Sequence, residues 1–238
     1  MRVAVIRFPG SNCDLDMVSS LAKIRGVQPK LVWHEEDLSD MDYDAIVLPG
    51  GFTFGDRLRA GAIAASSPAL SKVKALAEKG LPVLGVCNGF QVLVESGLLP
   101  GALLRNAGLN FVCKWVDIRV ENTKTSFTRS LKQGRVLRMP IAHGEGRYYL
   151  GARELERLEQ EGRVVFRYCD PSGRVGKESN PTGTLHNIAG VCNKAGNVVG
   201  LMPHPERAAE ALLSPLGHPD GALVLSSILS KSGGRRRA

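Results

Sequence analysis

The hydrophobic pattern of the first half of the chain predicts strands and helices in alternation. Strands are expected at four short apolar runs: 3–8, 30–34, 44–51 and 82–86. Helices are expected where apolar residues recur every three or four positions: 14–26, 69–79 and from residue 88 onward. Because strands and helices alternate, the pattern predicts a parallel, doubly wound sheet whose functional loops collect at the carboxyl ends of the strands.

The pattern changes from about residue 110 to segments rich in β-structure. Strands are expected at 111–122, 135–143 and 164–169, a charged helix at 152–162, and a hairpin that turns at Ala195-Gly196. No linker separates the two halves. We therefore predict an α/β fold with a single doubly wound, mostly parallel sheet flanked by helices and an antiparallel β extension, in one domain over 1–230 followed by a basic flexible tail at 231–238.

Composition and charge narrow the class of protein. The chain has 238 residues, a formal net charge of +8 and 5% aromatic residues, and no nucleic-acid-binding module is recognisable, so no nucleic-acid partner is expected. No apolar run reaches the length of a membrane span, and the first run is too short for a signal peptide, so we expect a cytoplasmic protein. The five cysteines contain no CxxC pair and no Cys/His cluster has ligand spacing, so no metal site is expected.

The stretch PVLGVCNGFQ (82–91) contains the first candidate for chemistry. Cys87 stands between Gly85 and Gly89 in the pattern of a nucleophile elbow, where a sharp strand-to-helix turn needs small neighbours. The first turn of the following helix would favour a thiolate, and the backbone N–H of Asn88 would face the site as an oxyanion-hole donor. The pattern is short, however, and a small buried core cysteine is the alternative reading.

A thiol nucleophile needs a base, and two histidines compete for that role. His204 lies in LMPHPER after a predicted strand; in an extended segment Glu206 would point the same way and orient the imidazole. The alternative is that Pro-His-Pro is only a rigid turn. His143 in PIAHGEGRYY is the competitor, because its glycine neighbours suggest a backbone that approaches a ligand.

The stretch LPGGFTFGDRLRAGA (48–62) follows another predicted strand. Its glycine pair can turn a backbone N–H into a pocket as an oxyanion donor, or serve only the chain reversal. It lacks the GxxxxGK[ST] pattern, so nucleotide phosphates are not expected to bind there, and no other ATP site is recognisable.

Taken in order, LPGG, GVCNGFQ and HPE resemble the class I, or triad, glutamine amidotransferases. Longer strings resemble one branch of them, the glutaminase subunits of de novo purine biosynthesis, over roughly residues 1–230. These strings are VIRFPGSNCDLD, GGFTFGDRLRAGAIA, NGFQVLVESGLLPGAL, RVENTKTSFT, PIAHGEGRY and GLMPHPERAAE.

The resemblance implies a role for each matched residue. Cys87 would attack the side-chain amide of L-glutamine, His204 would act as base and then acid, and Glu206 would orient it. Gly51 and Asn88 would supply the oxyanion hole. Gln91 would lie at the amino-acid end of glutamine, and three further residues would contact glutamine or the synthetase: His143, Glu145 and Arg147.

The resemblance also implies partners. Ammonia would pass to a large synthetase subunit that makes formylglycinamidine ribonucleotide, and a small third subunit would bridge the two, as in many bacteria. The synthetase would use ATP and magnesium, and this chain would need no cofactor. Two rival hypotheses are a cysteine hydrolase or chaperone of the DJ-1/PfpI type and a non-catalytic regulatory subunit. The first usually lacks a C-terminal Pro-His-Pro-Glu, and the second would lack a triad member, whereas none is missing here.

Overall fold

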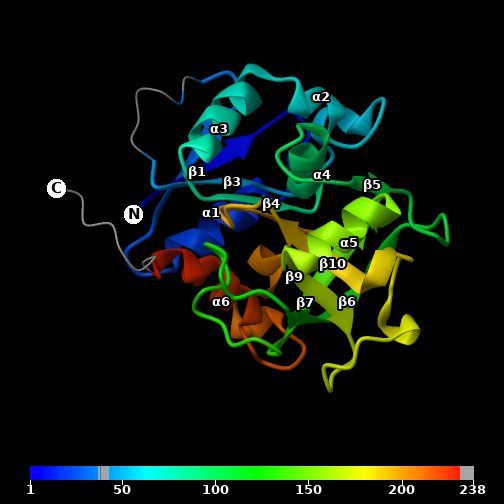
Figure 1. The fold of residues 1–238 in the computed structure, drawn as a ribbon. Coiled ribbons are helices and arrows are strands. Elements are labelled where there is room, and N and C mark those ends of the chain that lie inside the picture. Colours follow the sequence, from blue (N-terminus) through cyan, green and yellow to red (C-terminus); the bar gives the residue numbers. More distant parts are fainter. Residues whose placement is uncertain (37, 39–42, 231–238) are drawn as a thin grey trace.

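The computed structural model describes residues 1–36, 38 and 43–230, and its centre is a nine-stranded sheet (Figure 1). The strands follow the order β2-β1-β3-β4-β11-β10-β9-β6-β7. Neighbouring strands are parallel from β2 to β11 and antiparallel from β11 to β7. The sheet therefore joins a doubly wound half to an antiparallel half, and β11 belongs to both.

The inner strands of the parallel half are short and buried on both faces, as expected where helices cover a sheet on both sides, whereas the edge strand β2 is largely exposed. The strands of this half are β1 (Arg2–Arg7), β2 (Gln28–Trp33), β3 (Ala45–Leu48), β4 (Val83–Val86) and β11 (Val198–Leu201). All side chains of β3, β4 and β11 are buried. This explains why these segments appear in the sequence as continuous apolar runs rather than alternating ones.

In the antiparallel half, β7 and the second part of β6 alternate buried and partly exposed positions, whereas β9 and β10 are almost wholly buried. The strands of this half are β6 (Val112–Val120), β7 (Val136–His143), β9 (Val164–Cys169) and β10 (Ile188–Cys192). A second, two-stranded sheet pairs β5 (Ala102–Leu104) with β8 (Arg147–Tyr149). The hairpin at Ala195-Gly196 joins β10 to β11 and thereby ties the two halves together.

Helices cover the sheet and carry the loops that follow its strands. The α-helices are α1 (Asp14–Ala22), α2 (Ala62–Ala65), α3 (Pro68–Glu78), α4 (Asn88–Glu95), α5 (Ala152–Gln160) and α6 (Asp220–Ser226). Short 3-10 helices are η1 (Thr53–Asp56), η2 (Lys177–Ser179), η3 (Leu185–Asn187), η4 (Pro205–Ala208), η5 (Ala211–Leu213) and η6 (Ser227–Leu229). Helix α4 packs on β3, β4 and β11, whereas α1 packs on β1, β2 and α6.

The predicted fold class is confirmed, and most predicted elements lie within a few residues of the observed ones. The first helix ends at Ala22 rather than near Gly26, and helix α6 and the β5–β8 sheet were not predicted. Helix α6 is only seven residues long, too short for a clear helical period. The predicted tail at 231–238 lies outside the described residues.

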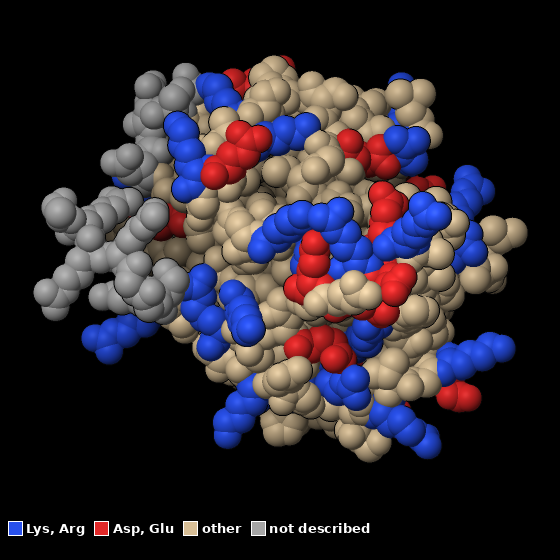
Figure 2. All heavy atoms as spheres, viewed as in Figure 1, with Lys and Arg blue, Asp and Glu red and all other residues tan. Residues whose placement is uncertain are grey.

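The surface charge is mixed. In the view of Figure 2, Lys and Arg alternate with Asp and Glu over the side that carries α5. Several of these charges are paired, as in Arg157–Glu161 and Arg167–Glu159.

No helix among the described residues is long and apolar enough to cross a membrane.

Candidate active site

Three neighbouring strands of the parallel half end side by side, and the predicted functional loops leave from their ends. Leu48 of β3 is in register with Gly85 of β4, and Val86 of β4 with Leu201 of β11. The backbone N–H of Cys87 donates to the carbonyl of Leu201 at 2.8 Å. The sheet thus brings together Cys87, the glycine pair that follows β3 and the segment that leads from β11 to His204.

The turn at Cys87 has the strained backbone of a nucleophile elbow. Cys87 has φ 50° and ψ −106° and immediately precedes α4. A Cβ at Gly89 would lie 2.0 Å from the carbonyl oxygen of Leu48, and one at Gly85 would lie 2.6 Å from the carbonyl oxygen of Gly89. Only glycine therefore allows α4 to approach the strands this closely, as the G-x-C-x-G pattern predicted.

Cys87 lines a cavity of about 230 Å³. Its side chain is largely buried, at 5% exposure, but it faces this cavity together with Gly51 and His204. The other lining residues are Asn12, Cys13, Phe52, Phe111, Ala142 and Arg207. The placement at a cavity favours the reading of Cys87 as a reactive residue over that of a plain core residue.

His204 and Glu206 form a buried pair. Glu206 Oε1 accepts a hydrogen bond from His204 Nδ1 at 2.6 Å, and both side chains are at most 2% exposed. The extended segment expected from the sequence is interrupted, because Pro205 begins the helix η4 and carries Glu206 back to the imidazole. The pairing was therefore predicted correctly, but the local geometry that produces it is a 3-10 turn.

The charge state of His204 follows from its neighbours. Burial is the largest single influence and would lower the pKa of His204. The carboxylate of Glu206 and the two nearby thiols of Cys13 and Cys87 outweigh burial and raise that pKa well above its ordinary value. Because Nδ1 is bonded to Glu206, Nε2 is the ring nitrogen that can exchange a proton with the substrate. Nε2 has no hydrogen-bond partner among the described residues. His204 is thus held ready to carry a positive charge beside Cys87.

His143 lies in a different environment. Its Nδ1 pairs with Oδ1 of Asn106 at 3.2 Å, and its ring packs so closely on Gly146 that a Cβ there would come within 2.0 Å of the ring. Burial, reinforced by the charge of His204, lowers the pKa of His143 to about 4. His143 is therefore neutral near pH 7 and has an amide rather than a carboxylate beside it, so the geometry favours His204 as the base.

The amide of Gln91 is engaged within the protein. Its Nε2 donates to the backbone oxygen of Glu145 at 2.6 Å, and its Oε1 accepts from Asn88 Nδ2 at 2.8 Å. Asn88 also accepts from the backbone N–H of Thr53 at 3.1 Å and donates to Asp56 at 3.2 Å. The first turn of α4 thus links the loop after β3 to the loop after β7.

The remaining predicted contact residues surround the site without lining the cavity. Glu145 lies 3.8 Å from Arg105 in a half-exposed ion pair. Arg147 begins β8, and its Nε is buried without a hydrogen-bond partner among the described atoms. Gly51 does line the cavity, and it must be glycine because its φ is 156° and a Cβ there would lie 2.7 Å from the carbonyl oxygen of Gly10.

Sequence reasoning missed Cys13, which precedes α1 and lies in the same cavity as Cys87. A ligand atom of Cys13 lies within 4.8 Å of ligand atoms of His204 and Glu206. Arg207 Nη2 donates to Cys13 Sγ at 3.2 Å. The only signal for this residue in the sequence is its place after the first strand, at the same edge of the sheet as Cys87.

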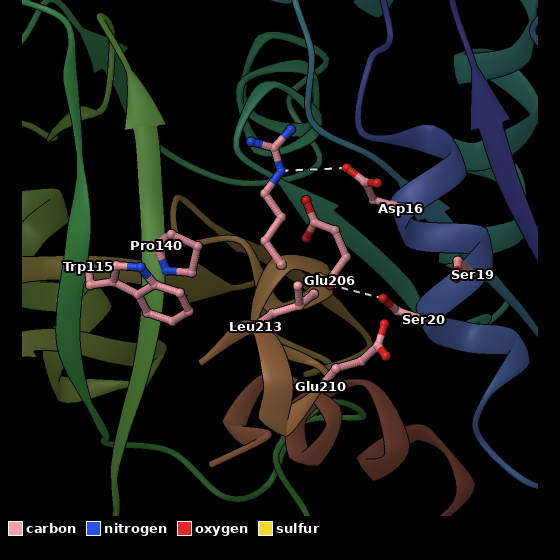
Figure 3. A pocket seen from close by; sticks show the side chains of 9 residues that line it. Asp16, Ser19, Ser20, Trp115, Pro140, Glu206, Glu210 and Leu213 are labelled. Atoms are coloured by element: carbon pink, nitrogen blue, oxygen red, sulfur yellow. Dashed lines mark hydrogen bonds and ion pairs between the residues drawn. The ribbon is translucent and has the colours of Figure 1, made fainter. Parts of the chain in front are cut away.

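A second cavity of about 430 Å³ lies on another side of Glu206 (Figure 3). Figure 3 shows Glu206 between Asp16 and Ser20 of α1 and the side chains of Trp115 and Pro140. Ser20 Oγ donates to the backbone oxygen of Glu206 at 2.9 Å. Helix α1 therefore fixes the turn that carries the carboxylate.

Comparison with known proteins agrees with this site. The sequence model of the CobB/CobQ-like glutamine amidotransferase domain matches residues 1–223. The chain therefore belongs to the glutamine amidotransferase family.

Within this family the chain is similar to proteins named phosphoribosylformylglycinamidine synthase subunit PurQ. It is 55% identical to the protein of that name from Thermomicrobium roseum, and the match covers 97% of this chain and 96% of the relative. It is 53% identical to the one from Aquifex aeolicus, and that match covers 97% of this chain and 100% of the relative. A chain in the structure of PurLQS from Thermotoga maritima superposes with a TM-score of 0.82 at 44% identity and covers 96% of this chain and 97% of its own length. These identities place the chain in the PurQ branch of the family.

Proposed function

We propose that the chain is the glutaminase subunit of a phosphoribosylformylglycinamidine synthase, hydrolysing L-glutamine to glutamate and ammonia. The observation that carries the proposal is the joint placement of a strained cysteine elbow and a carboxylate-bound histidine at one cavity. The names of relatives that share half of its residues support the choice of pathway. Membership of the glutamine amidotransferase family disfavours a DJ-1/PfpI-type hydrolase, and the presence of Cys87, His204 and Glu206 together disfavours a non-catalytic subunit.

The reaction follows from the roles of these three side chains. Cys87 Sγ attacks the amide carbon of glutamine while His204 holds the thiol proton, and the negative charge that develops on oxygen faces the backbone N–H groups of Gly51 and Asn88. His204 then gives its proton to the leaving nitrogen, so ammonia departs and a γ-glutamyl thioester remains. A water that loses a proton to His204 attacks the thioester, and glutamate leaves as the thiol is restored. Glu206 keeps the imidazole in the orientation that each transfer needs.

The remaining contacts of the loops suggest how glutamine is enclosed. Gln91 and Asn88 position the loops after β3 and β7. Glu145, which pairs with Arg105, and Arg147 lie outside the cavity, and they would contact the amino-acid end of glutamine or a partner. The partner is a large synthetase subunit that uses ATP and magnesium, with a small bridging subunit. Two observations support this partner: the similar structure from Thermotoga maritima is one of PurLQS, and this sequence has no recognisable ATP site.

The first test labels the cysteine with the glutamine analogue 6-diazo-5-oxo-norleucine, beside a plain thiol alkylator, and measures intact mass. A single adduct on the wild type that is lost in Cys87→Ala is the expected result, because only a thiol beside a glutamine pocket reacts with the analogue. If the alkylator alone reacts at Cys87, the measurement is repeated with the synthetase present. If neither reagent reacts there in the complex, Cys87 is a core residue and the proposal fails.

The second test separates the making of ammonia from its use. In the assembled complex, Cys87→Ala or His204→Ala should abolish amination that depends on glutamine and leave amination by added ammonia intact, because neither residue takes part in using ammonia. Both rates are measured on the same preparation. Loss of both activities would contradict the division of labour between the subunits.

A further inference from the structure

The Nδ1 side of His204 gathers more metal-binding groups than the glutaminase reaction uses. The thiol of Cys13, a nitrogen of His204 and a carboxylate oxygen of Glu206 lie within 4.8 Å of one another, and all three side chains are buried. The groups come from the loop after β1 and from the turn after β11, so no local spacing in the sequence reveals them. Thiolate, imidazole and carboxylate together are a typical ligand set for zinc.

The backbone leaves room for these groups to meet. A Cβ on Gly50 would lie 3.2 Å from Cys13 Sγ, 2.7 Å from Cε1 of His204 and 3.4 Å from its Nδ1. The thiol and the Nδ1 edge of the imidazole therefore pack on the same glycine. Glu206 Oε2 adds a buried acceptor with no hydrogen-bond partner among the described residues. Cys13 and His204 also line the adjoining cavity, through which an ion and a water molecule as fourth ligand can reach the site.

We infer that Cys13, His204 and Glu206 form a binding site for a thiophilic divalent ion such as Zn²⁺, and that the bound ion inhibits the glutaminase reaction. The ion binds Cys13 Sγ, His204 Nδ1 and Glu206, with water as the fourth ligand. Two protons leave to solvent, one from the thiol and one from Nδ1. Ligand atoms around tetrahedral zinc stand roughly 3–4 Å apart, so a small inward movement of the donors suffices.

Inhibition follows from the chemistry of imidazole. A neutral imidazole bound to metal through Nδ1 carries its remaining proton on Nε2. That nitrogen can then no longer accept a proton from Cys87 or from water. The inhibitory part of the inference rests on the proposed function, whereas the binding of the ion does not.

The charges around the site favour a cation on balance. The guanidinium of Arg207 donates to Cys13 Sγ at 3.2 Å, and its positive charge opposes a cation at this place. Asp16 lies 3.6 Å from Arg207 and offsets part of its charge. A thiolate and the carboxylate of Glu206 contribute two negative charges directly to the ion.

The experiment measures Zn²⁺ binding by competition with a chromogenic chelator, and the absorption of Co²⁺ as a probe of thiolate ligation. Wild type and Cys87→Ala should each bind one ion and show a thiolate-to-cobalt charge-transfer band. Cys13→Ala should lose the band and bind Zn²⁺ more than about 100-fold more weakly, because it lacks a direct ligand. Cys13→Ser keeps the size of the side chain, so a loss of binding in this variant cannot be attributed to misfolding. Cys113→Ala removes the exposed thiol and serves as the control for binding at the surface.

Activity gives the second readout. Zn²⁺ should suppress glutaminase activity of the wild-type complex, a chelator should restore it, and activity that remains in Cys13→Ser should resist the ion. Absence of binding to the wild type, or unchanged binding in both Cys13 variants, would overturn the inference. So would loss of binding in Cys87→Ala, since the ion would then sit on the catalytic thiol. Because Cys87→Ala has no glutaminase activity, its metal binding is judged independently of the proposed function.

Discussion

At the scale of single residues, the most informative feature is the backbone of Cys87. A residue with a Cβ rarely adopts φ 50° with ψ −106°, and such a conformation costs about 1–3 kcal/mol. The surrounding contacts hold it there: the N–H of Cys87 is bound to Leu201, and Gly89 lies against Leu48. The strain places the thiol at the beginning of α4, so stability is given up at the position where reactivity is needed.

This strain predicts a gain in stability when the side chain is removed altogether. Cys87→Gly should be more stable than Cys87→Ala by about 1 kcal/mol, because glycine relieves the positive φ and part of that gain is lost to the greater freedom of the unfolded chain. Both variants lack the thiol, so the difference between their free energies of unfolding reports the cost of the backbone conformation at residue 87. The free energies of unfolding come from urea denaturation. Equal stabilities would mean that Cys87 is not strained in solution.

The buried pair of His204 and Glu206 predicts a graded loss of activity. Glu206→Ala should lower kcat by about 10²–10⁴-fold, whereas Cys87→Ala removes the reaction, because Glu206 acts only through the imidazole. Without the carboxylate, burial lowers the pKa of His204, which NMR titration of the imidazole would detect. An unchanged rate would remove Glu206 from the mechanism, and an unchanged titration would contradict its electrostatic role.

The sequence identified the residues whose local surroundings are distinctive. Cys87 was recognisable from its flanking glycines, and His204 from its prolines and the glutamate two positions later. Cys13 and Asn106 have no such surroundings, because their partners are distant in sequence: Arg207 for Cys13 and His143 for Asn106. Contacts of this kind depend on the pairing of strands and cannot be inferred from spacing.

At the scale of elements, the half-buried carboxyl of Asp56 joins η1 to α4, because it accepts a hydrogen bond from Asn88. Burial, together with the charge of Glu145, raises the pKa of Asp56 from 3.8 to about 6, although its hydrogen bond with Asn88 opposes the rise. The folded protein therefore binds this proton more tightly than the unfolded chain. Asp56 also has a φ of 51°, so the segment is held in an uncommon conformation beside the cavity.

The raised pKa sets the sign of a pH dependence. Between about pH 4 and pH 6 the folded state keeps a proton that the unfolded chain releases, so this group makes stability fall as the pH rises through that window. The contribution is at most about 3 kcal/mol and smaller because solvent screens a half-exposed group. Asp56→Asn should flatten the fall, as measured by urea denaturation at each pH. An identical pH profile in the variant would refute the assignment.

At the scale of the whole molecule, the sequence predicted the elements better than their arrangement. The alternation of strands and helices was enough for a doubly wound sheet, and the late β-rich segments were enough for an antiparallel extension. The insertion of β11 between β4 and β10 was not foreseen, because it depends on contacts between segments more than a hundred residues apart in sequence. That insertion brings His204 beside Cys87, and it makes the site a product of the complete sheet.

The C-terminal part of the domain belongs to the same cooperative unit, which predicts where the chain can be shortened. Removal of 231–238 should leave the melting temperature unchanged, because this stretch, KSGGRRRA, contains no large apolar side chain that a core could bury. Removal of 220–238 deletes α6 and η6 with three buried aliphatic side chains, Val224, Leu225 and Ile228. That loss of roughly 5–9 kcal/mol approaches the whole stability of a domain.

The longer truncation should also disable the site before the fold is lost. A Cβ on Gly221 of α6 would lie 1.9 Å from the carbonyl oxygen of Pro205, so α6 packs directly against the turn that carries Glu206. Calorimetry on both truncations, with labelling of Cys87 by the glutamine analogue, checks the two effects together. A stable and fully reactive chain without 220–238 would contradict the prediction, since the turn at Glu206 would then hold its shape without α6.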